Sequence, residues 1–363
     1  MSTDAPLAAR LAHRTLELVN IASVSRDEAA IMRYVRAAIP AGFAEWFADG
    51  EALVVGTQRR PGVPLVLLAG HVDTVPAQDN FPGRLEESQV IGLGASDMKG
   101  GIAVMLELAA RVARTPTAPA LDLALVIFTR EELSVAESPL PAAFAACPQV
   151  GEAVLAVVLE PTDNTVQLGC MGNLNATLRF RGRSAHSARP WTGDNAITRA
   201  VAGLAGLVAT APRAVTIEGL EFTEVVSVTR IRGGVADNVI PDLVECHVNF
   251  RFTPGRSAAE AEATLRGLVG PVGELEITGV SPAGRVAPRT PLLERLIAAG
   301  GFQVGPKQAW TPVAQFTEIG IDAVNLGPGA TAMAHARDER VALDDLVRTY
   351  DALFRFVGAD GAA

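Results

Sequence analysis

Four near-continuous apolar runs constrain the fold more than any other feature of this chain. They read "PLVLLAG", "LDLALVIFT", "EAVLAVVLE" and "IDAVNLG", at residues 64–70, 121–129, 152–160 and 321–327. Strands that are covered by helices on both faces have this composition, whereas half-exposed strands alternate polar and apolar residues. Between the first two runs, residues 101–114 have the apolar spacing of a helix. The order predicts an α/β domain with a mostly parallel sheet.

The middle of the chain follows a different pattern. Its segments read as strand, helix, strand, strand, helix and strand, at 175–182, 194–209, 223–234, 242–252, 257–269 and 274–280. This βαββαβ order is typical of a ferredoxin-like unit. Because the apolar run at 321–327 comes after it, we expect an insertion at 173–286 in an α/β domain formed by 1–172 and 287–363.

Three of the four apolar runs end on residues that bind metals in proteins. His71 follows the first run, Glu131 and Glu132 follow the second, and Glu160 ends the third. Ligands of open α/β sheets bind beyond the carboxyl ends of the strands, so these side chains are expected at one edge. A single polar residue at a strand end usually just contacts water. The prediction therefore depends on finding such residues at the ends of three strands.

His71 and Asp73 stand two residues apart in "GHVDTVP". In an extended backbone such residues point to the same face, which suits a metal-bound imidazole oriented by a carboxylate. A solvated turn before Pro76 is the alternative. Asp97, in the glycine-rich "GLGASDMKGG", is a candidate to bridge two cations, or it caps the helix that follows.

The adjacent Glu131 and Glu132 point in different directions, so one can bind metal while the other remains a base for the attacking water. A solvated acidic turn is the alternative. Glu160 ends an apolar strand, where an unpaired charge is costly, and pairing with a cation is therefore favoured.

Two of the five histidines are further candidates. His335 follows the glycine-rich loop after the last apolar run, which brings it to the same edge of the sheet, and His186 lies in the predicted insertion. His13 and His247 are interpreted as structural. The resulting nitrogen and oxygen ligands suit zinc, with cobalt or manganese as substitutes.

Charge and cysteine spacing narrow the class of partner. A net charge of −9 disfavours nucleic acid and anionic membranes, which prefer basic surfaces. The three cysteines lie far apart without a C-x-x-C spacing, and the N-terminal residues lack a continuous signal-peptide core. We expect a cytoplasmic protein that acts on a small molecule.

The motifs "GHVDTVP", "GASDMKGG", "EE", "LEPT", "SAHSARPWTGDNAI", "DNVIP", "NFRF" and "AHARDE" together resemble one family over nearly the whole length. This is the co-catalytic di-zinc metallopeptidase and aminoacylase family, which includes succinyl-diaminopimelate desuccinylase, acetylornithine deacetylase and the glutamate carboxypeptidases. The actinobacterial-type desuccinylases are the most similar members. The resemblance implies a homodimer that associates through the inserted lid domain.

The resemblance also implies roles for individual residues. His71, Asp97 and Glu160 would hold one zinc ion, and Asp97, Glu132 and His335 the other, so that Asp97 bridges. A further set of residues would act on the substrate or orient a ligand: Glu131 as general base, Asp73 as the partner of His71, His186 as an oxyanion donor to the partner subunit, and Arg251 and Asn238 as substrate contacts. From the residues alone, Arg251 could equally be a surface charge, and His186 could only pack in the turn before Pro190.

The expected reaction is hydrolysis of N-succinyl-LL-diaminopimelate to succinate and LL-diaminopimelate, with two Zn²⁺ per chain and Co²⁺ as a substitute. The sequence departs from the desuccinylase pattern at Pro312, Gln315 and Ala336. These departures leave open another N-acyl-amino-acid deacylase or a zinc dipeptidase. A dimeric small-molecule-binding protein is the non-enzymatic alternative.

Overall fold

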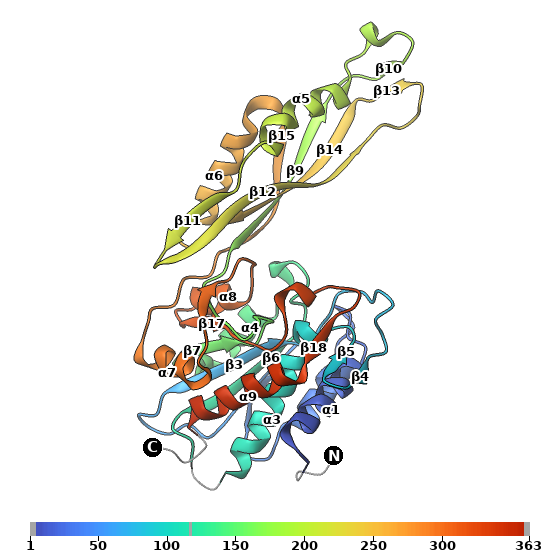
Figure 1. The fold of residues 1–363 in the computed structure, drawn as a ribbon. Coiled ribbons are helices and arrows are strands. Elements are labelled where there is room, and N and C mark those ends of the chain that lie inside the picture. The colour runs from blue at the N-terminus through green and yellow to red at the C-terminus, as the bar shows by residue number, and fades with distance from the viewer. Residues whose placement is uncertain (1–4, 116–117, 359–363) are drawn as a thin grey trace. The chain divides into compact units, whose positions relative to one another are not determined.

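The computed structural model describes residues 5–115 and 118–358. The chain folds into two compact units. The first extends to Gly169 and also contains Ala287–Gly305 and the chain from Pro312 onward; the second contains Cys170–Val286 and Pro306–Thr311. Figure 1 shows both units, and each is described separately below.

The first unit is built on an eight-stranded sheet. Its strands, in spatial order, are β1 (Ala44–Ala48), β2 (Ala52–Gly56), β6 (Asp122–Phe128), β3 (Leu65–His71), β7 (Ala153–Val158), β17 (Ala323–Asn325), β8 (Val166–Leu168) and β16 (Val304–Pro306). The neighbouring strands β6, β3, β7 and β17 are parallel. They correspond to the four apolar runs, which confirms the predicted α/β class with a large, mostly parallel central sheet.

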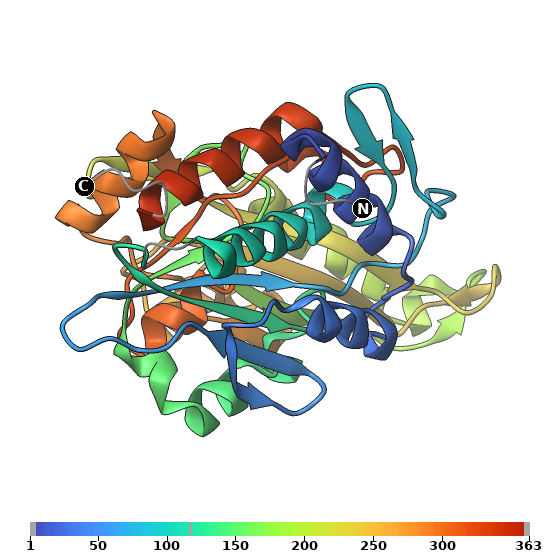
Figure 2. The ribbon, with the colours of Figure 1, turned by 90° about the horizontal axis from the view of Figure 1, so that it is seen from below.

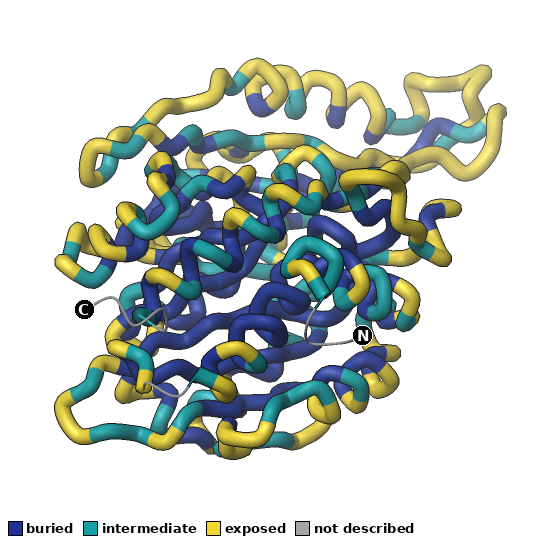
Figure 3. Tube along the Cα trace, turned by 60° about the horizontal axis from the view of Figure 1, so that its bottom comes forward, coloured by how far each residue is buried: buried dark blue, intermediate teal, exposed yellow. Residues whose placement is uncertain are grey.

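Helices cover both faces of this sheet, which explains why its central strands are apolar throughout. On one face α1 (Leu7–Val19), α3 (Gly100–Arg114) and α9 (Leu343–Val357) pack together, and α4 (Leu140–Ala146) and α8 (Val313–Glu318) lie on the other (Figure 2). Every residue of β3 and β6 is buried, and Figure 3 shows this buried interior. The remaining helices of the unit are α2 (Ala29–Ala38) and α7 (Pro291–Gly300).

The start of α3 lies very close to the end of β7. A Cβ atom at Gly101 would lie 2.6 Å from the Leu159 carbonyl oxygen, so only glycine allows this approach. A small sheet of β4 (Arg84–Glu86), β5 (Gln89–Ile91) and β18 (Arg340–Ala342) joins the chain after His335 to the segment before α3. In the part of the chain that the structure describes, no helix has the length and apolarity needed to cross a bilayer.

The second unit is an antiparallel sheet with two helices on one face. The spatial order is β11 (Arg213–Ile217), β12 (Leu220–Gly233), β14 (Leu243–Phe252), β9 (Gly172–Arg181) and β15 (Glu274–Ser281). The helices are α5 (Ala196–Val208) and α6 (Ala258–Val269). Residues along β9 and β14 alternate between buried and partly exposed, as expected for a sheet with one covered face.

Strand β11 has no counterpart among the strands predicted from the sequence. This strand forms a tight hairpin with β12, in which Ile217 pairs with Leu220 and the two linking residues, Glu218 and Gly219, both have positive φ. Two-residue hairpin loops favour this conformation because it matches the strand twist. A separate two-stranded ribbon, β10 (Ala185–His186) with β13 (Val239–Ile240), completes the unit.

Candidate metal centre

The carboxyl ends of three neighbouring strands carry most of the candidate site. β3 ends on His71, the chain leaving β6 supplies Glu131 and Glu132, and the chain leaving β7 supplies Glu160. Asp97 comes from the irregular segment just before α3, and His335 from the loop after β17, at a φ of 60°. The structure thus brings all five predicted ligands to one edge of one unit.

These residues form two groups that share Asp97. Ligand atoms of His71, Asp97 and Glu160 lie within 4.8 Å of one another, as do those of Asp97, Glu132 and His335. Asp97 Oδ1 lies 3.2 Å from His71 Nε2, and Asp97 Oδ2 lies 3.5 Å from His335 Nε2. The two oxygens of one carboxylate therefore face two histidines, which is the arrangement needed to bridge two cations.

Asp73 organises the first group from behind and is fully buried. Its Oδ1 lies 3.3 Å from His71 Nδ1, which leaves Nε2 of the same ring directed at Asp97. The Asp73 carboxylate also accepts hydrogen bonds from the backbone N–H groups of Glu131, at 3.0 Å, and Glu132, at 3.1 Å. One side chain thus orients both the imidazole and the turn that carries the two glutamates.

The titration of these groups reflects an excess of negative charge. Burial lowers the pKa of His71, but hydrogen bonds to Asp73 and Asp97 outweigh it and hold this pKa well above its ordinary value. The hydrogen bond to Glu132, 2.9 Å long, raises the pKa of His335 to about 9. Loss of solvation raises the pKa of Glu131 well above its ordinary value, and the charge of Glu160 raises it further.

This excess of negative charge around buried histidine and carboxylate groups is typical of a site that binds cations. Nitrogen and oxygen donors without a thiolate fit zinc, cobalt or manganese. Each group has at least one histidine nitrogen and two carboxylates at mutual distances that one ion can span. The residues present therefore fit a pair of divalent cations, with Asp97 shared.

Two residues near the site were missed by the sequence analysis. Glu339, which is 1% exposed, accepts hydrogen bonds from the backbone N–H groups of Gly94, Ser96 and Asp97, at 2.9–3.0 Å. Burial raises its pKa to about 7. Lys99 is also buried and donates to the Ile21 carbonyl oxygen at 2.9 Å. Glu339 ends the motif "AHARDE", but its charged neighbours make that segment look like an ordinary surface loop.

The other predicted site residues lie in the second unit. His186 and Asn238 are neighbours there, because His186 pairs with Val239 in the β10–β13 ribbon. Both are exposed, and the Asn238 carbonyl oxygen accepts a hydrogen bond from the Ser187 N–H at 2.9 Å. Arg251 is half-buried on β14, where its Nε donates to Asn249. Their roles remain predictions.

Comparisons with known proteins place the chain in a family. Residues 67–359 match the model described as peptidase family M20/M25/M40. One relative is a Mycobacterium tuberculosis protein with the provisional name succinyl-diaminopimelate desuccinylase. It is 40% identical to this chain over 348 residues, which are 95% of this chain and 97% of that protein. A Corynebacterium glutamicum succinyl-diaminopimelate desuccinylase is 36% identical over 292 residues, 77% of each chain.

The fold comparison agrees with the sequence comparison. The crystal structure of aminopeptidase PepT from Bacillus cereus superposes with a TM-score of 0.77 at 19% identity, covering 98% of this chain and 99% of that one. The chain therefore belongs to peptidase family M20/M25/M40, a family of metal-dependent hydrolases that act on amide bonds.

Proposed function

We propose that this protein hydrolyses N-succinyl-LL-diaminopimelate to succinate and LL-diaminopimelate in the cytoplasm, with two zinc ions per chain. The observation that carries the metal part of the proposal is Asp97, whose two oxygens face His71 and His335. The names of the relatives in M. tuberculosis and C. glutamicum support the substrate.

When bound, the two cations supply the positive charge that polarises an amide carbonyl and acidifies a water molecule. His71, Asp97, Glu132, Glu160 and His335 would hold them. Glu131 belongs to neither ligand group, and its backbone is held by Asp73. Its side chain is therefore available to take the proton of the attacking water and to return it to the leaving amine.

We further propose that His186 donates a hydrogen bond to the developing oxyanion in the site of a partner subunit. The backbone N–H of Ala188 donates to His186 Nδ1 at 3.0 Å, which leaves Nε2 as the nitrogen that carries a proton in the neutral ring. Exposed apolar residues on α5, namely Ile197, Val201 and Val208, support association of two chains through this unit.

Arg251 is proposed to bind a substrate carboxylate and Asn238 a polar group nearby. Arg179 and Arg181 on the adjacent strand pair with glutamates, whereas Arg251 makes no ion pair with a carboxylate among the described residues. A half-buried guanidinium without an acidic partner suits an anionic ligand.

The departures from the desuccinylase pattern bear on the acyl group. Gln315, on α8, is 3% exposed and accepts a hydrogen bond from Ser138 Oγ at 3.2 Å. Pro312 directly precedes the same helix. The Ala336 carbonyl oxygen accepts from Asn80 Nδ2 at 3.3 Å. Gln315 is thus accommodated within the first unit, and the support for the succinyl substrate comes from the names of the relatives.

The test is a substrate panel with zinc-reconstituted protein. N-succinyl-LL-diaminopimelate, N-acetylornithine, other N-acetyl amino acids and dipeptides are compared by kcat/KM, with Glu131→Gln protein as the blank. The proposal predicts the highest kcat/KM for the succinyl substrate. A higher value for an acetyl amino acid or a dipeptide would replace it with the corresponding deacylase or dipeptidase.

A further inference from the structure

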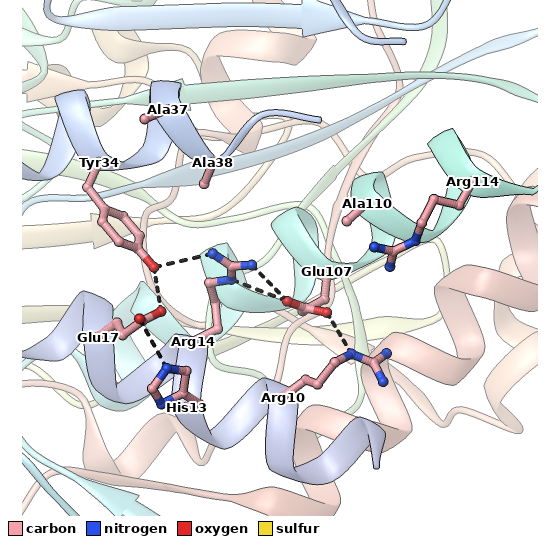
Figure 4. A pocket seen from close by; sticks show the side chains of 10 residues that line it. All are labelled: Arg10, His13, Arg14, Glu17, Tyr34, Ala37, Ala38, Glu107, Ala110 and Arg114. Atoms are coloured by element: carbon pink, nitrogen blue, oxygen red, sulfur yellow. Dashed lines mark hydrogen bonds and ion pairs between the residues drawn. The ribbon is translucent and has the colours of Figure 1, made fainter. Parts of the chain in front are cut away.

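A cavity of about 360 Å³ lies in the first unit between α1, α2 and α3. Figure 4 shows its lining, and we call it the Arg114 pocket. Its size falls in the range of small-molecule sites. None of its lining residues belongs to the candidate metal centre. It is therefore a separate place on the molecule that the proposed reaction does not use.

A fixed polar network forms one wall of the pocket. Glu107, on α3, accepts hydrogen bonds from Arg10 at 3.1 Å and from Arg14 at 3.0 Å, both on α1. Arg14 also donates to the hydroxyl of Tyr34, on α2, at 3.3 Å. The Tyr34 hydroxyl donates in turn to Glu17 at 2.6 Å. The two glutamates are thus already engaged, and the network holds the three helices in place around the cavity.

Arg114 is different because its charge is not balanced. It is exposed at the end of α3, and it makes no ion pair or hydrogen bond with any residue that the structure describes. Figure 4 shows its side chain on the far side of the cavity from Tyr34 and Glu17. Three arginines line the pocket against two glutamates, which leaves an excess of positive charge.

Small side chains create the empty space. Ala37 and Ala38 from α2 and Ala110 from α3 line the pocket, where longer residues would fill it. An aliphatic portion of a ligand could pack on these methyl groups while an anionic group reaches the guanidinium of Arg114. Guanidinium groups bind carboxylate and phosphate oxygens through paired hydrogen bonds.

We propose that the Arg114 pocket binds a small dianionic metabolite, either a phosphate or a dicarboxylate, through the guanidinium of Arg114. The site is independent of the metal centre and of the reaction proposed above.

Calorimetric titration of the zinc-loaded full chain tests the proposal at constant ionic strength. Sulfate is the probe for a tetrahedral oxyanion, and glutarate is the probe for a dicarboxylate. Arg114→Ala removes the unpaired charge, and Ala110→Leu fills the cavity without changing charge. Arg33→Ala is the matched control, because Arg33 is exposed on α2, outside the pocket, and makes no ion pair with the described residues.

We expect saturable binding of at least one probe, weakened about 10-fold or more by Arg114→Ala and by Ala110→Leu, and unchanged by Arg33→Ala. Tighter binding of sulfate assigns a phosphate ligand, and tighter binding of glutarate assigns a dicarboxylate. Absence of saturable binding, or equal weakening by Arg114→Ala and Arg33→Ala, would overturn the proposal. If Ala110→Leu lowers the melting temperature, the two arginine variants still decide the question, because neither arginine has a partner to lose among the residues that the structure describes.

Discussion

Two regions of the molecule balance buried carboxylates in different ways: the surroundings of Glu224 in the second unit, and the candidate metal centre of the first. In the second unit, Glu224 is 5% exposed and accepts hydrogen bonds from Arg256 Nε at 2.8 Å and Arg256 Nη2 at 3.1 Å. Burial raises its pKa, but the hydrogen bonds from Arg256 and Thr253 outweigh burial and lower it. Glu224 is thus charged and satisfied within its own chain.

The candidate metal centre gathers more carboxylates and supplies less positive charge, whereas elsewhere in the first unit the buried Glu107 is paired with two arginines. Among the described residues, no arginine or lysine forms an ion pair with Asp73, Glu131 or Glu132, and histidines pair with the cluster instead. The pKa of Glu131 is raised, in contrast to that of Glu224. A buried carboxylate whose negative charge is balanced by an arginine stabilises the fold, whereas a buried carboxylate without such a partner is available to bind an added cation.

The largest effect should come from Glu131→Gln, which removes the proposed base while leaving both ligand groups intact. Because an amide cannot accept the proton of water, we expect kcat to fall by about 10²-fold or more. Zinc content and melting temperature should stay near wild type. Near-wild-type kcat in this variant would mean that another residue is the base.

His186→Ala tests the role proposed for the second unit, which is to supply a hydrogen-bond donor and no metal ligand. Loss of one oxyanion donor typically lowers turnover by ~10²- to 10³-fold, and zinc content should not change. The decisive measurement mixes His186→Ala chains with Glu131→Gln chains under conditions that exchange subunits.

In a mixed dimer, the site with an intact Glu131 receives an intact His186 from its neighbour, so activity should return. If activity stays absent although exchange is verified by mass, His186 does not act across subunits and only packs in its turn.

Glu339→Gln probes the residue that positions the bridging carboxylate. The amide keeps the size of Glu339 but weakens the acceptors for three backbone N–H groups around Asp97. Loss of such a partner typically lowers metal affinity by about 10- to 100-fold, which competition with a chromophoric chelator measures. The matched control is Asp338→Asn, an exposed neighbour paired with Arg340. Equal zinc affinity in the two variants would leave Glu339 without a positioning role.

The smallest effect on catalysis, and a clear one on stability, is expected from Glu224→Gln. Replacing the charged acceptor weakens its hydrogen bonds with Arg256 and should lower the free energy of unfolding by about 2 kcal/mol at neutral pH, with zinc affinity unchanged. Denaturant titration measures this difference. A loss of zinc affinity would show that the two units do not balance charge independently.

The same pair has a defined pH dependence. Because the pKa of Glu224 is lower in the folded than in the unfolded chain, its contribution to stability is present above the ordinary glutamate pKa and is lost as the pH falls through the folded value. The stability difference between wild type and Glu224→Gln should therefore shrink in acid. A difference that is constant with pH would contradict the charged pair.

The contrast between the units also explains what could be predicted from the sequence. Strands β3 and β6 are buried along their whole length, so a polar residue such as His71 can stand only at an end, where it signals the site. In β9 and β14, polar side chains alternate along the whole strand, so the position of Arg251 carries no such signal. Glu339 was missed because its role lies in backbone contacts distant in sequence, which no local pattern reveals.

The central claim is that the first unit holds a pair of catalytic metal ions bridged by Asp97. The most direct test is the metal content of the zinc-reconstituted full chain after removal of loosely bound metal, with Asp97→Ala in parallel. The account predicts about two zinc ions per chain in the wild type and a loss of zinc from both sites in the variant. Zinc content near zero in the wild type, or equal content in wild type and Asp97→Ala, would contradict it.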